Sequence, residues 1–246
     1  MVGPPTPPGA YHRTMDGVGP AIEALEQVQL FAGLDRATLE RLATGMRTRR
    51  FRRNEVLFHQ GDPGDSLFIV TSGAVKIMLP SEEGDEAILA TVRPGAFFGE
   101  LALLDGAPRS ATAVALEPTE TLILPRERFR FLIDTEPATR DALLAALAGE
   151  LRRLTDHVEE LHFLDMTGRM AARLLRLAQG SGVTADDGTV RVMGSWTQGD
   201  LAAMIGATRQ SVNKLLGQFV DDGLIRLERD AIVIVDLPGL ERTARR

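Results

Sequence analysis

An acidic and a basic residue flank a tight turn in the stretch GELALLDGAPRSATA, which covers residues 99–113. Glu100 can accept a hydrogen bond from a ligand hydroxyl, and Arg109 can pair in a fork with phosphate oxygens. Ser110 and nearby backbone N–H groups can serve the remaining acceptors. These residues suit a ligand that carries both a hydroxyl and a phosphate. A structural salt bridge between Glu100 and Arg109 across the turn would use the same pair.

A second chemistry-bearing stretch, TRQSVNKLLGQF, covers residues 208–219. Thr208 is a suitable N-cap for a helix that begins at Arg209. Its inward face is predicted to hold Val212, Leu215, Leu216 and Phe219. Polar side chains occupy the positions between them, as expected of a helix that presents hydrogen-bonding groups to another molecule.

The first stretch lies in a region of short strands. Between residues 51 and 125, the segments SLFIVTS, AVKIMLP, EAILATV and TETLILP are separated by glycine-rich turns. Short strands at this spacing indicate an all-β sandwich or roll. Two short helices are predicted before it, over residues 22–30 and 35–46, with Asp35 as the N-cap of the second.

A long helix is predicted from residue 137 to residue 164. Its apolar residues follow a 3, 4, 3, 4, 3 spacing, which is a heptad seam. We interpret it as the seam of a parallel two-stranded dimer, and packing of the helix on its own β-domain is the alternative. The seam residues are Leu144, Leu147, Leu151, Leu154, Val158 and Leu161.

The remaining C-terminal segments fall in the order of a winged helix-turn-helix. Asp165 is a good N-cap for a helix over residues 166–179, and a hairpin closes at Asp187 and Gly188. Helices over residues 198–205 and 209–222 meet at a tight turn at Gly206. A second hairpin, with its turn near Arg229 and Asp230, ends the pattern.

The composition bounds the classes of function. The chain has 246 residues, of which 44% are hydrophobic, so it can build sizeable cores. The absence of cysteine excludes disulfides, thiolate metal sites and cysteine-ligated iron–sulfur clusters. Four scattered histidines predict no metal site. No run of eighteen apolar residues is present, so no membrane span is expected. Residues 1–20 read as a disordered tail without a signal peptide, so we expect a cytoplasmic protein.

Charge is distributed unevenly along the chain. The net charge is −6 in total, with −8 in residues 1–165 and +2 in residues 166–246. This excludes a uniformly basic nucleic-acid coat. A small sequence-reading domain can still concentrate its cations on one helix.

Together these features resemble the CRP/FNR family of bacterial transcription regulators, over residues 22–237. The stretches GELALLDGAPRSATA, FLDMTGRMAARLL and TQGDLAAMIGATRQSVNKLLGQFVDDGLI carry the resemblance. It implies an α+β fold with an N-terminal β-roll (a double-stranded β-helix or jelly roll) that binds a cyclic nucleotide, a long dimerisation helix and a C-terminal winged helix-turn-helix. The implied boundaries are residues 21–136, 137–164 and 165–246.

The resemblance implies a cyclic-nucleotide effector, with cAMP as the leading candidate. The ligand-binding residues it implies are Gly99, Glu100, Leu101, Arg109, Ser110, Ala111, Leu154 and Thr155. Where the family's type member offers two adjacent hydroxyls to the adenine, this chain has Leu154, without one, and Thr155. Another ligand, such as cGMP or a cyclic dinucleotide, or activity without ligand therefore stays open. Haem is not expected, because no histidine occupies an evident ligand position in the β-roll, where His59, next to a turn, is the only candidate.

The resemblance also implies the DNA-binding residues. Arg209, Gln210 and Lys214 take base-reading places, and Gln210 replaces a glutamate of the type member, so the half-site should overlap the TGTGA type without necessarily matching it. Arg169, Thr197 and Gln198 are candidates for phosphate contacts, although Arg169 can equally be a hinge salt-bridge residue. The full set is Arg209, Gln210, Ser211, Asn213, Lys214, Arg169, Thr197 and Gln198.

The partners implied are double-stranded DNA with a two-fold symmetric operator, a second copy of the chain, and RNA polymerase. An enzyme such as a cyclic-nucleotide hydrolase is disfavoured, because neither metal ligands nor an activated nucleophile cluster in the sequence. A regulatory module bound to another protein is disfavoured by the helix-turn-helix in residues 196–227.

Overall fold

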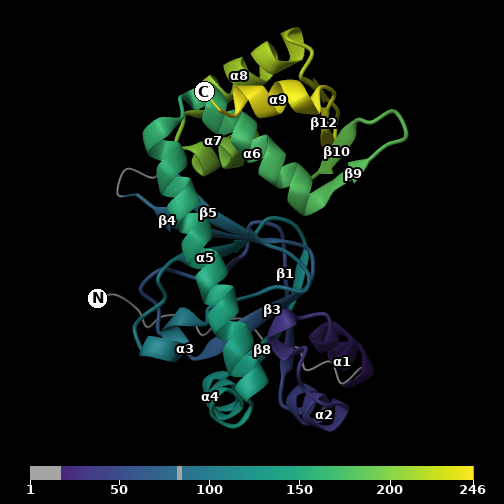
Figure 1. The fold of residues 1–246 in the computed structure, drawn as a ribbon. Helices are drawn as coiled ribbons and strands as arrows, with labels where there is room; N and C mark the ends of the chain where they lie inside the picture. Colours follow the sequence, from purple (N-terminus) through teal and green to yellow (C-terminus); the bar gives the residue numbers. More distant parts are fainter. Residues whose placement is uncertain (1–17, 82–84, 195, 246) are drawn as a thin grey trace. The chain divides into compact units, whose positions relative to one another are not determined.

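The structure is a computed structural model that describes residues 18–81, 85–194 and 196–245 (Figure 1). Contacts between Cα atoms divide the chain into two compact units. The first unit contains the described residues of 1–75 and 92–145. The second contains those of 76–91 and 146–246.

Two four-stranded sheets form the β-region. One is antiparallel and has the order β1-β8-β3-β6, and the other has the order β2-β7-β4-β5. This arrangement confirms the predicted β-roll. The strands are β1 (Arg47–Phe51), β2 (Val56–Phe58), β3 (Ser66–Ser72), β4 (Val75–Pro80), β5 (Glu86–Val92), β6 (Phe97–Phe98), β7 (Thr112–Ala115) and β8 (Thr119–Pro125).

The register of β8 joins β1 and β3 into one sheet. Phe51 of β1 lies opposite Thr119, and Leu67 of β3 lies opposite Leu124. The aromatic core beside this sheet brings three rings together, because the centroids of Phe58, Phe68 and Phe98 lie 5.3–5.9 Å apart. Burial of Phe68, Phe98 and the apolar side chains around them supplies the main driving force for folding of this unit.

The helices of the first unit differ in part from the prediction. Asp35 caps α2 by accepting a hydrogen bond from the Thr38 N–H at 2.7 Å, as predicted. The predicted helix over residues 22–30 is wrong in extent, because Val28 is extended and the chain continues into a separate 3-10 turn. The helices are α1 (Val18–Glu26), η1 (Gln29–Phe31), α2 (Arg36–Thr44), α3 (Leu101–Asp105), α4 (Arg126–Thr135) and the start of α5 (Pro137–Phe163).

Several boundaries of helices and strands also differ from the prediction. Residues 18–20 were expected in the disordered tail but belong to α1, and residues 1–17 lie outside the described residues. The sheet begins at Arg47 rather than at Phe51, since the arginines of β1 hide its alternation. The apolar run after Glu100 forms α3, and α4 follows β8 where no element was expected.

The second unit contains the winged helix-turn-helix. Asp165 caps α6 by accepting from the Gly168 N–H at 2.7 Å, and Gly206 ends α7 with a φ of 65°, which favours glycine. The wing is a four-stranded sheet with the order β11-β12-β10-β9. The elements are α6 (Met166–Ser181), β9 (Gly182–Thr184), β10 (Val190–Met193), α7 (Gln198–Ile205), α8 (Arg209–Asp221), β11 (Ile225–Leu227), β12 (Ala231–Ile234) and α9 (Leu237–Thr243).

The C-terminal helix α9 was not predicted. Asp236 starts it by accepting a hydrogen bond from the Gly239 N–H at 2.9 Å, and Leu240 is fully buried. Among the helices that the structure describes, none is long and apolar enough to cross a membrane.

Candidate ligand cassette and DNA-binding helix

The cassette GELALLDGAPRSATA folds as a glycine turn, a short helix and a return strand. Gly99 follows β6 with a φ of 85°, and a Cβ added there would lie 2.6 Å from Nη1 of Arg109. The positive φ favours glycine, and a Cβ there would force the Arg109 guanidinium to shift. Glu100 starts α3, Gly106 ends it with a φ of 77°, and Arg109 leads into β7.

The Arg109 side chain is turned into the protein. Arg109 is 4% exposed, and its terminal nitrogens donate to the backbone carbonyls of Gly99 and Ser66, each at 2.8 Å. The guanidinium carbon lies 4.3 Å from the centroid of the Phe58 ring, a cation–π contact. Burial lowers the pKa of Arg109, and the charges of Asp65 and Glu100 act in the opposite direction.

The structure brings together the two ends of the cassette. Glu100 is half-buried, and Ser110 and Leu101 are exposed. Ala111 is buried at the start of the return strand. Leu154 and Thr155 lie on α5 in the second unit, where the Thr155 hydroxyl donates to the Leu151 carbonyl at 3.0 Å.

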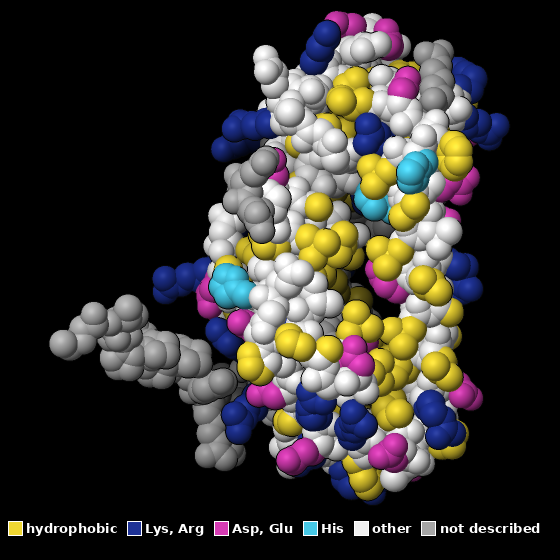
Figure 2. All heavy atoms as spheres, turned by 90° about the vertical axis from the view of Figure 1, so that its left-hand side faces the viewer, with side chains coloured by type: hydrophobic (Ala, Val, Ile, Leu, Met, Phe, Trp, Pro, Cys, Tyr) yellow, Lys and Arg dark blue, Asp and Glu magenta, His cyan; other side chains and the backbone are white. Residues whose placement is uncertain are grey.

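The predicted seam of α5 is largely uncovered in the single chain. Leu151 is 66% exposed, and Leu144, Leu154, Val158 and Leu161 are also exposed, whereas Leu147 is half-buried. Hydrophobic side chains gather on the face drawn in Figure 2. On the same helix, Leu143 lies outside the seam and is buried. The helix thus buries a position next to the seam and leaves the seam itself available.

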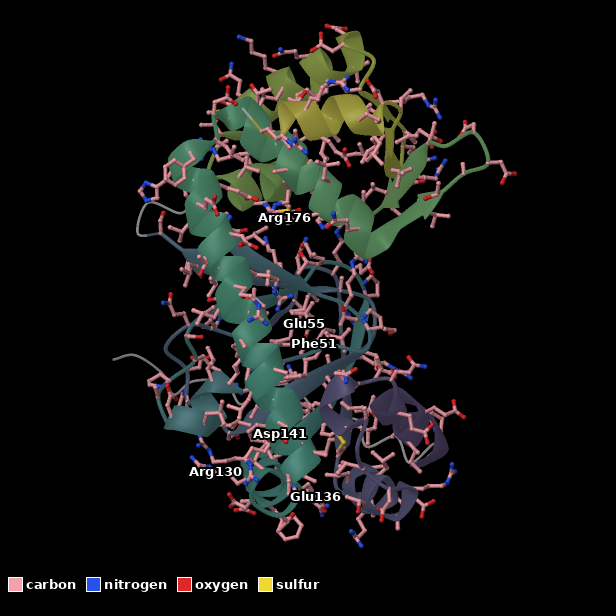
Figure 3. All side chains as sticks on the ribbon, in the orientation of Figure 1. Phe51, Glu55, Arg130, Glu136, Asp141 and Arg176 are labelled. Atoms are coloured by element: carbon pink, nitrogen blue, oxygen red, sulfur yellow. The ribbon has the colours of Figure 1, made fainter. Side chains whose placement is uncertain are left out.

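The corner between α5 and α6 is held by an ion pair. Both Oε atoms of Glu160 accept hydrogen bonds from Arg176, which Figure 3 labels. Burial of the Glu160 carboxyl favours its neutral form, but His157 and Arg176 outweigh burial and lower its pKa to about 2. Arg173 donates to the Met204 carbonyl, and burial lowers its pKa to about 10. Neither contact was predicted from the sequence.

The helix-turn-helix is capped at both of its helices. Thr197 and Asp200 form a reciprocal capping box at α7, and Thr208 accepts from the Ser211 N–H at 3.1 Å to cap α8. The inward face of α8 is buried as predicted, with Val212 and Phe219 inaccessible to solvent. Arg209, Gln210, Asn213 and Lys214 are exposed, and Ser211 is half-buried.

The three candidates for phosphate contacts have different surroundings. Arg169 donates to the Ile205 carbonyl at 2.9 Å, so it braces the turn of the helix-turn-helix through a backbone group rather than a salt bridge. Thr197 is used by the capping box. Gln198 donates to the Asn213 side chain at 3.0 Å, which links α7 to α8.

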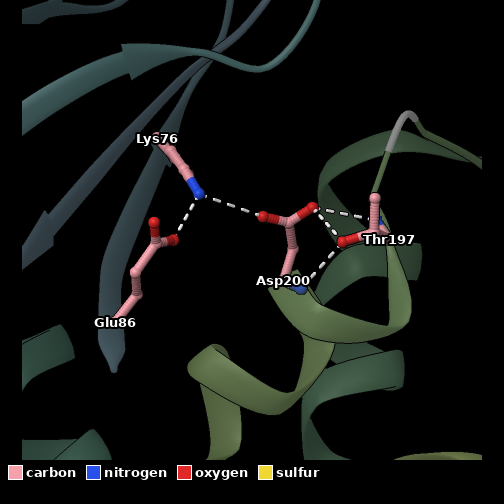
Figure 4. Close-up of polar contacts among 4 residues, drawn as sticks. All are labelled: Lys76, Glu86, Thr197 and Asp200. Atoms are coloured by element: carbon pink, nitrogen blue, oxygen red, sulfur yellow. Dashed lines mark hydrogen bonds and ion pairs between the residues drawn. The ribbon is translucent and has the colours of Figure 1, made fainter. Parts of the chain in front are cut away.

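A buried ion-pair cluster holds the N-terminal end of α7 (Figure 4). Nζ of Lys76 lies 3.2 Å from Oδ1 of Asp200 and also pairs with Glu86. Lys76 and Asp200 side chains are each 11% exposed. Burial opposes the charged form of both, but their mutual contact, Glu86 and Thr197 outweigh it, so the pKa of Lys76 is raised and the pKa of Asp200 is lowered. The sequence signal was a lysine within the apolar strand AVKIMLP.

Metal-ligating residues do not cluster in the described ranges 18–81, 85–194 and 196–245. There, no group of three or more His, Asp or Glu side chains could hold a metal ion. The His59 N–H donates to the Asp62 carboxylate at 2.8 Å.

Two family models match the chain. The model described as a cyclic nucleotide-binding domain matches residues 48–136, and the model described as a Crp-like helix-turn-helix domain matches residues 168–243. The first range contains the cassette, and the second contains α7 and α8.

Curated relatives align over most of the chain. A CRP-like cAMP-activated global transcriptional regulator of Mycobacterium tuberculosis is 36% identical over 223 residues, which are 91% of this chain and 99% of that protein. The cyclic AMP receptor protein of Thermus thermophilus is 34% identical over 87% of this chain and 96% of its own length.

Solved structures share the fold. A CRP/FNR-family transcriptional regulator of Thermus thermophilus superposes with a TM-score of 0.67 at 31% identity, over 81% of this chain and 98% of its own. The c-di-GMP responsive global regulator CLP of Xanthomonas campestris superposes with a TM-score of 0.70 at 25% identity, over 82% of this chain and 100% of its own.

Proposed function

The chain belongs to the CRP/FNR family of bacterial transcription regulators, and we propose that it is a homodimer whose operator binding is controlled by cAMP. The family assignment makes it a cyclic-nucleotide-binding, DNA-binding regulator rather than an enzyme. The observation that carries the ligand proposal is the 2.8 Å contact between Arg109 and the Gly99 carbonyl, which joins the two ends of the cassette.

In the proposed site, the cyclic phosphate takes over the donors of Arg109. The guanidinium would exchange the carbonyls of Gly99 and Ser66 for phosphate oxygens, which are stronger, charge-assisted acceptors. Glu100 would accept from the ribose hydroxyl, and Ser110, being exposed, can donate to the phosphate. Leu101 and Ala111 would line the pocket. The relatives named for cAMP support cAMP as the ligand.

A different nucleotide is the second candidate. Leu154 has no hydroxyl to offer an adenine amine, and the Thr155 hydroxyl donates to its own helix. A fold relative at 25% identity is named as c-di-GMP responsive. These observations favour including cGMP and cyclic dinucleotides in any test, together with activity in the absence of ligand.

The dimer would form along α5. Its exposed apolar seam has heptad spacing, which in a two-stranded coiled coil lets each side chain enter a hole of the facing helix. Covering five exposed apolar side chains is favourable at about 25 cal/mol per Å². We propose that Leu154 and Thr155 then lie near the ligand of one or both subunits.

The DNA surface would be the exposed side of α8. Arg209 and Lys214 can reach guanine or phosphate, and Gln210 can both donate to and accept from adenine. Gln198 and Thr197 lie at the start of α7, where contacts with the phosphate backbone of the DNA are expected. A cytoplasmic location and contact with RNA polymerase complete the proposal, in line with relatives named as global transcriptional regulators.

Calorimetry against cAMP, cGMP and c-di-GMP tests the ligand. The Arg109→Ala variant should lose binding, because it removes the guanidinium of the cassette. Arg130→Ala is the matched control, since Arg130 is exposed and donates to the Leu104 carbonyl at the end of α3 (Figure 3). Equal affinity of the wild type and Arg109→Ala would place the nucleotide elsewhere. Binding of a different nucleotide with the same dependence on Arg109 would replace cAMP and keep the site.

A further inference from the structure

Helix α6 carries three arginines on one face. Arg169, Arg173 and Arg176 are spaced by four and three residues, which places them on successive turns of the same side of the helix. The Nε atom of each is buried and makes no hydrogen bond to any residue that the structure describes. Their stems are therefore enclosed by protein. Since arginine is seldom buried without a partner, the groups that they contact indicate what they do.

Arg173 reaches the C-terminal end of α7. An α-helix leaves its last carbonyls without a partner inside the helix. At the end of α7, the N–H groups of Gly206 and Ala207 both turn back to the Ala202 carbonyl. Met204 is 1% exposed, and its carbonyl accepts a hydrogen bond from Arg173 at 3.1 Å. Because a buried carbonyl without a donor is costly, this bond stabilises the end of the helix.

Arg169 bonds to the next carbonyl along the chain. Its Nη1 donates to the Ile205 carbonyl at 2.9 Å, so two adjacent carbonyls each receive a guanidinium donor. A cation is also favourable at a helix C-terminus, where the helix dipole is negative. The turn that follows lies against the same group, since a Cβ added to Gly206 would be 3.6 Å from Nη1 of Arg169. The two arginines thus fix the direction in which the chain leaves α7.

The connection from α7 to α8 is short. Residues 206–208 separate the end of α7 at Ile205 from the start of α8 at Arg209. A turn of this length leaves little room for independent movement of the two helices, so the end of α7 sets the place where α8 begins. Hydrogen bonds to base edges require a narrow range of length and direction. A small displacement of α8 would therefore weaken them.

The charge of Glu160 on α5 acts on Arg173 from the other side of α6. Burial lowers the pKa of Arg173 to about 10, the charge of Arg176 acts in the same direction, and the charge of Glu160 opposes both. The Glu160 carboxylate itself bonds to Arg176 (Figure 3). Arg173 therefore stays charged at neutral pH. Its bond to the Met204 carbonyl is charge-assisted, which makes it stronger than a bond between neutral groups.

A contact with a DNA phosphate is the alternative role for an arginine in this unit. Arg173 is poorly suited to it, because its Nη2 donates to the Met204 carbonyl and its Nε is buried. The two roles give different salt dependence. A phosphate contact adds about 0.9 to the slope of log affinity against log salt concentration, whereas a positioning residue leaves that slope unchanged.

We propose that Arg173 is a positioning residue for DNA reading: it holds the end of α7 and thereby sets where the exposed side of α8 meets the bases. The proposal rests on the proposed DNA surface of α8. Arg173 lies outside the two helices of the helix-turn-helix, and in this role it improves discrimination between DNA sequences without touching DNA.

Gel-shift titrations of the full chain test this role. The probes are a duplex that the wild type selects from a randomised pool and a duplex of the same length with that sequence scrambled, each titrated with and without cAMP. The measured quantity is the Kd for the scrambled duplex divided by the Kd for the selected duplex.

Arg173→Met removes the donors and keeps an apolar stem. It should lower this ratio about tenfold, which one well-placed base contact is worth, and leave the salt slope on both duplexes unchanged. Arg173→Lys should give an intermediate ratio, because an ammonium can still donate to the Met204 carbonyl. Arg242→Met is the matched control, since it removes a charge from a 74% exposed side chain of the same unit and should leave the ratio unchanged.

Three results would overturn the proposal. The first is an unchanged ratio in Arg173→Met, and the second is an equal loss of affinity for both duplexes, which a loss of folded protein would produce. The third is a salt slope that falls by about one, which would make Arg173 a phosphate contact. A wild type that selects no sequence from the pool overturns it as well.

Two further variants keep the outcome readable. If the fluorescence of Trp196 shows that Arg173→Met does not fold, Arg173→Lys decides the question: its ratio should fall about threefold, and an unchanged ratio overturns the proposal. Arg209→Ala tests the proposed DNA surface separately. A ratio equal to that of the wild type in Arg209→Ala counts against that surface, while the Arg173 variants still decide the positioning role.

Discussion

Replacing Glu160 by Gln should weaken the second unit at neutral pH and remove part of its acid sensitivity. The variant keeps the shape of the side chain and removes the charge that pairs with Arg176 at the corner between α5 and α6. The pKa of Glu160 is lowered from 4.5 to about 2 in the folded protein. Folding therefore favours the ionised form, which the variant lacks.

The magnitude follows from linkage between protonation and folding. A difference of 2.5 pKa units corresponds to about 3.4 kcal/mol at pH 7 and to about 1.4 kcal/mol at pH 3. These are upper limits, because the Arg176 side chain is 35% exposed and solvent screens the pair. We expect a loss of about 1–3 kcal/mol in the free energy of unfolding at pH 7. Because the folded pKa is depressed, this stabilisation is present above pH 4.5 and is lost as the pH falls toward 2.

Urea unfolding followed by tryptophan fluorescence measures this change. The chain has one tryptophan, Trp196, and it lies in the second unit, so the signal reports that unit. Glu159→Gln is the matched control, because Glu159 directly precedes Glu160 in α5 and its own carboxylate is exposed. The difference in the free energy of unfolding between the wild type and Glu160→Gln should fall by more than half between pH 7 and pH 3. A difference that is absent at pH 7, or equal at both pH values, would refute the reasoning.

Three further outcomes are expected. Leu151→Glu/Leu154→Glu should give monomers, because like charges would face each other across the seam; an unchanged dimer in sedimentation would contradict the proposed interface. Asp200→Ala should cost about 1–3 kcal/mol in urea unfolding, and more than Lys76→Met, because it removes both the acceptor of the capping box and the anion of the ion pair; an equal or smaller loss would mean that the cap contributes little. cAMP should tighten operator binding by roughly 5–150-fold in gel shifts at one fixed salt concentration, and identical affinity with bound ligand would argue against coupling.

Local signals predicted the helix starts and the turns well. Asp35, Asp165 and Thr208 were identified as N-caps because a capping side chain bonds within its own first turn, and each is confirmed by its hydrogen bond. The tight turn at Gly206 is likewise encoded by one residue that tolerates a positive φ. The order of strands and helices therefore followed from the sequence.

Contacts between distant segments could not be predicted from the sequence. The bonds of Arg109 to the carbonyls of Gly99 and Ser66, and the pair of Glu160 with Arg176, depend on how separate elements pack. The start of β1 at Arg47 was missed, because arginines occupy most of this strand and Phe51 is its one buried residue. The short helix α3 was read as an apolar run, because five residues give too little helical periodicity.

The ion-pair cluster of Lys76, Glu86 and Asp200 bears on how this protein can be recombined with its relatives. Residues 76–91 fall in the same compact unit as the helix-turn-helix, although a long segment of the chain separates them from α7. A chimera that takes a foreign DNA-reading segment from residue 165 onward would keep Lys76 and lose Asp200. The buried ammonium would then rely on Glu86 alone, at a cost that is highest where no acid replaces the aspartate. We expect functional hybrids to be recovered when residues 76–91 and the DNA-reading segment are exchanged together, so the part that has to be exchanged is made of two separate stretches of the sequence.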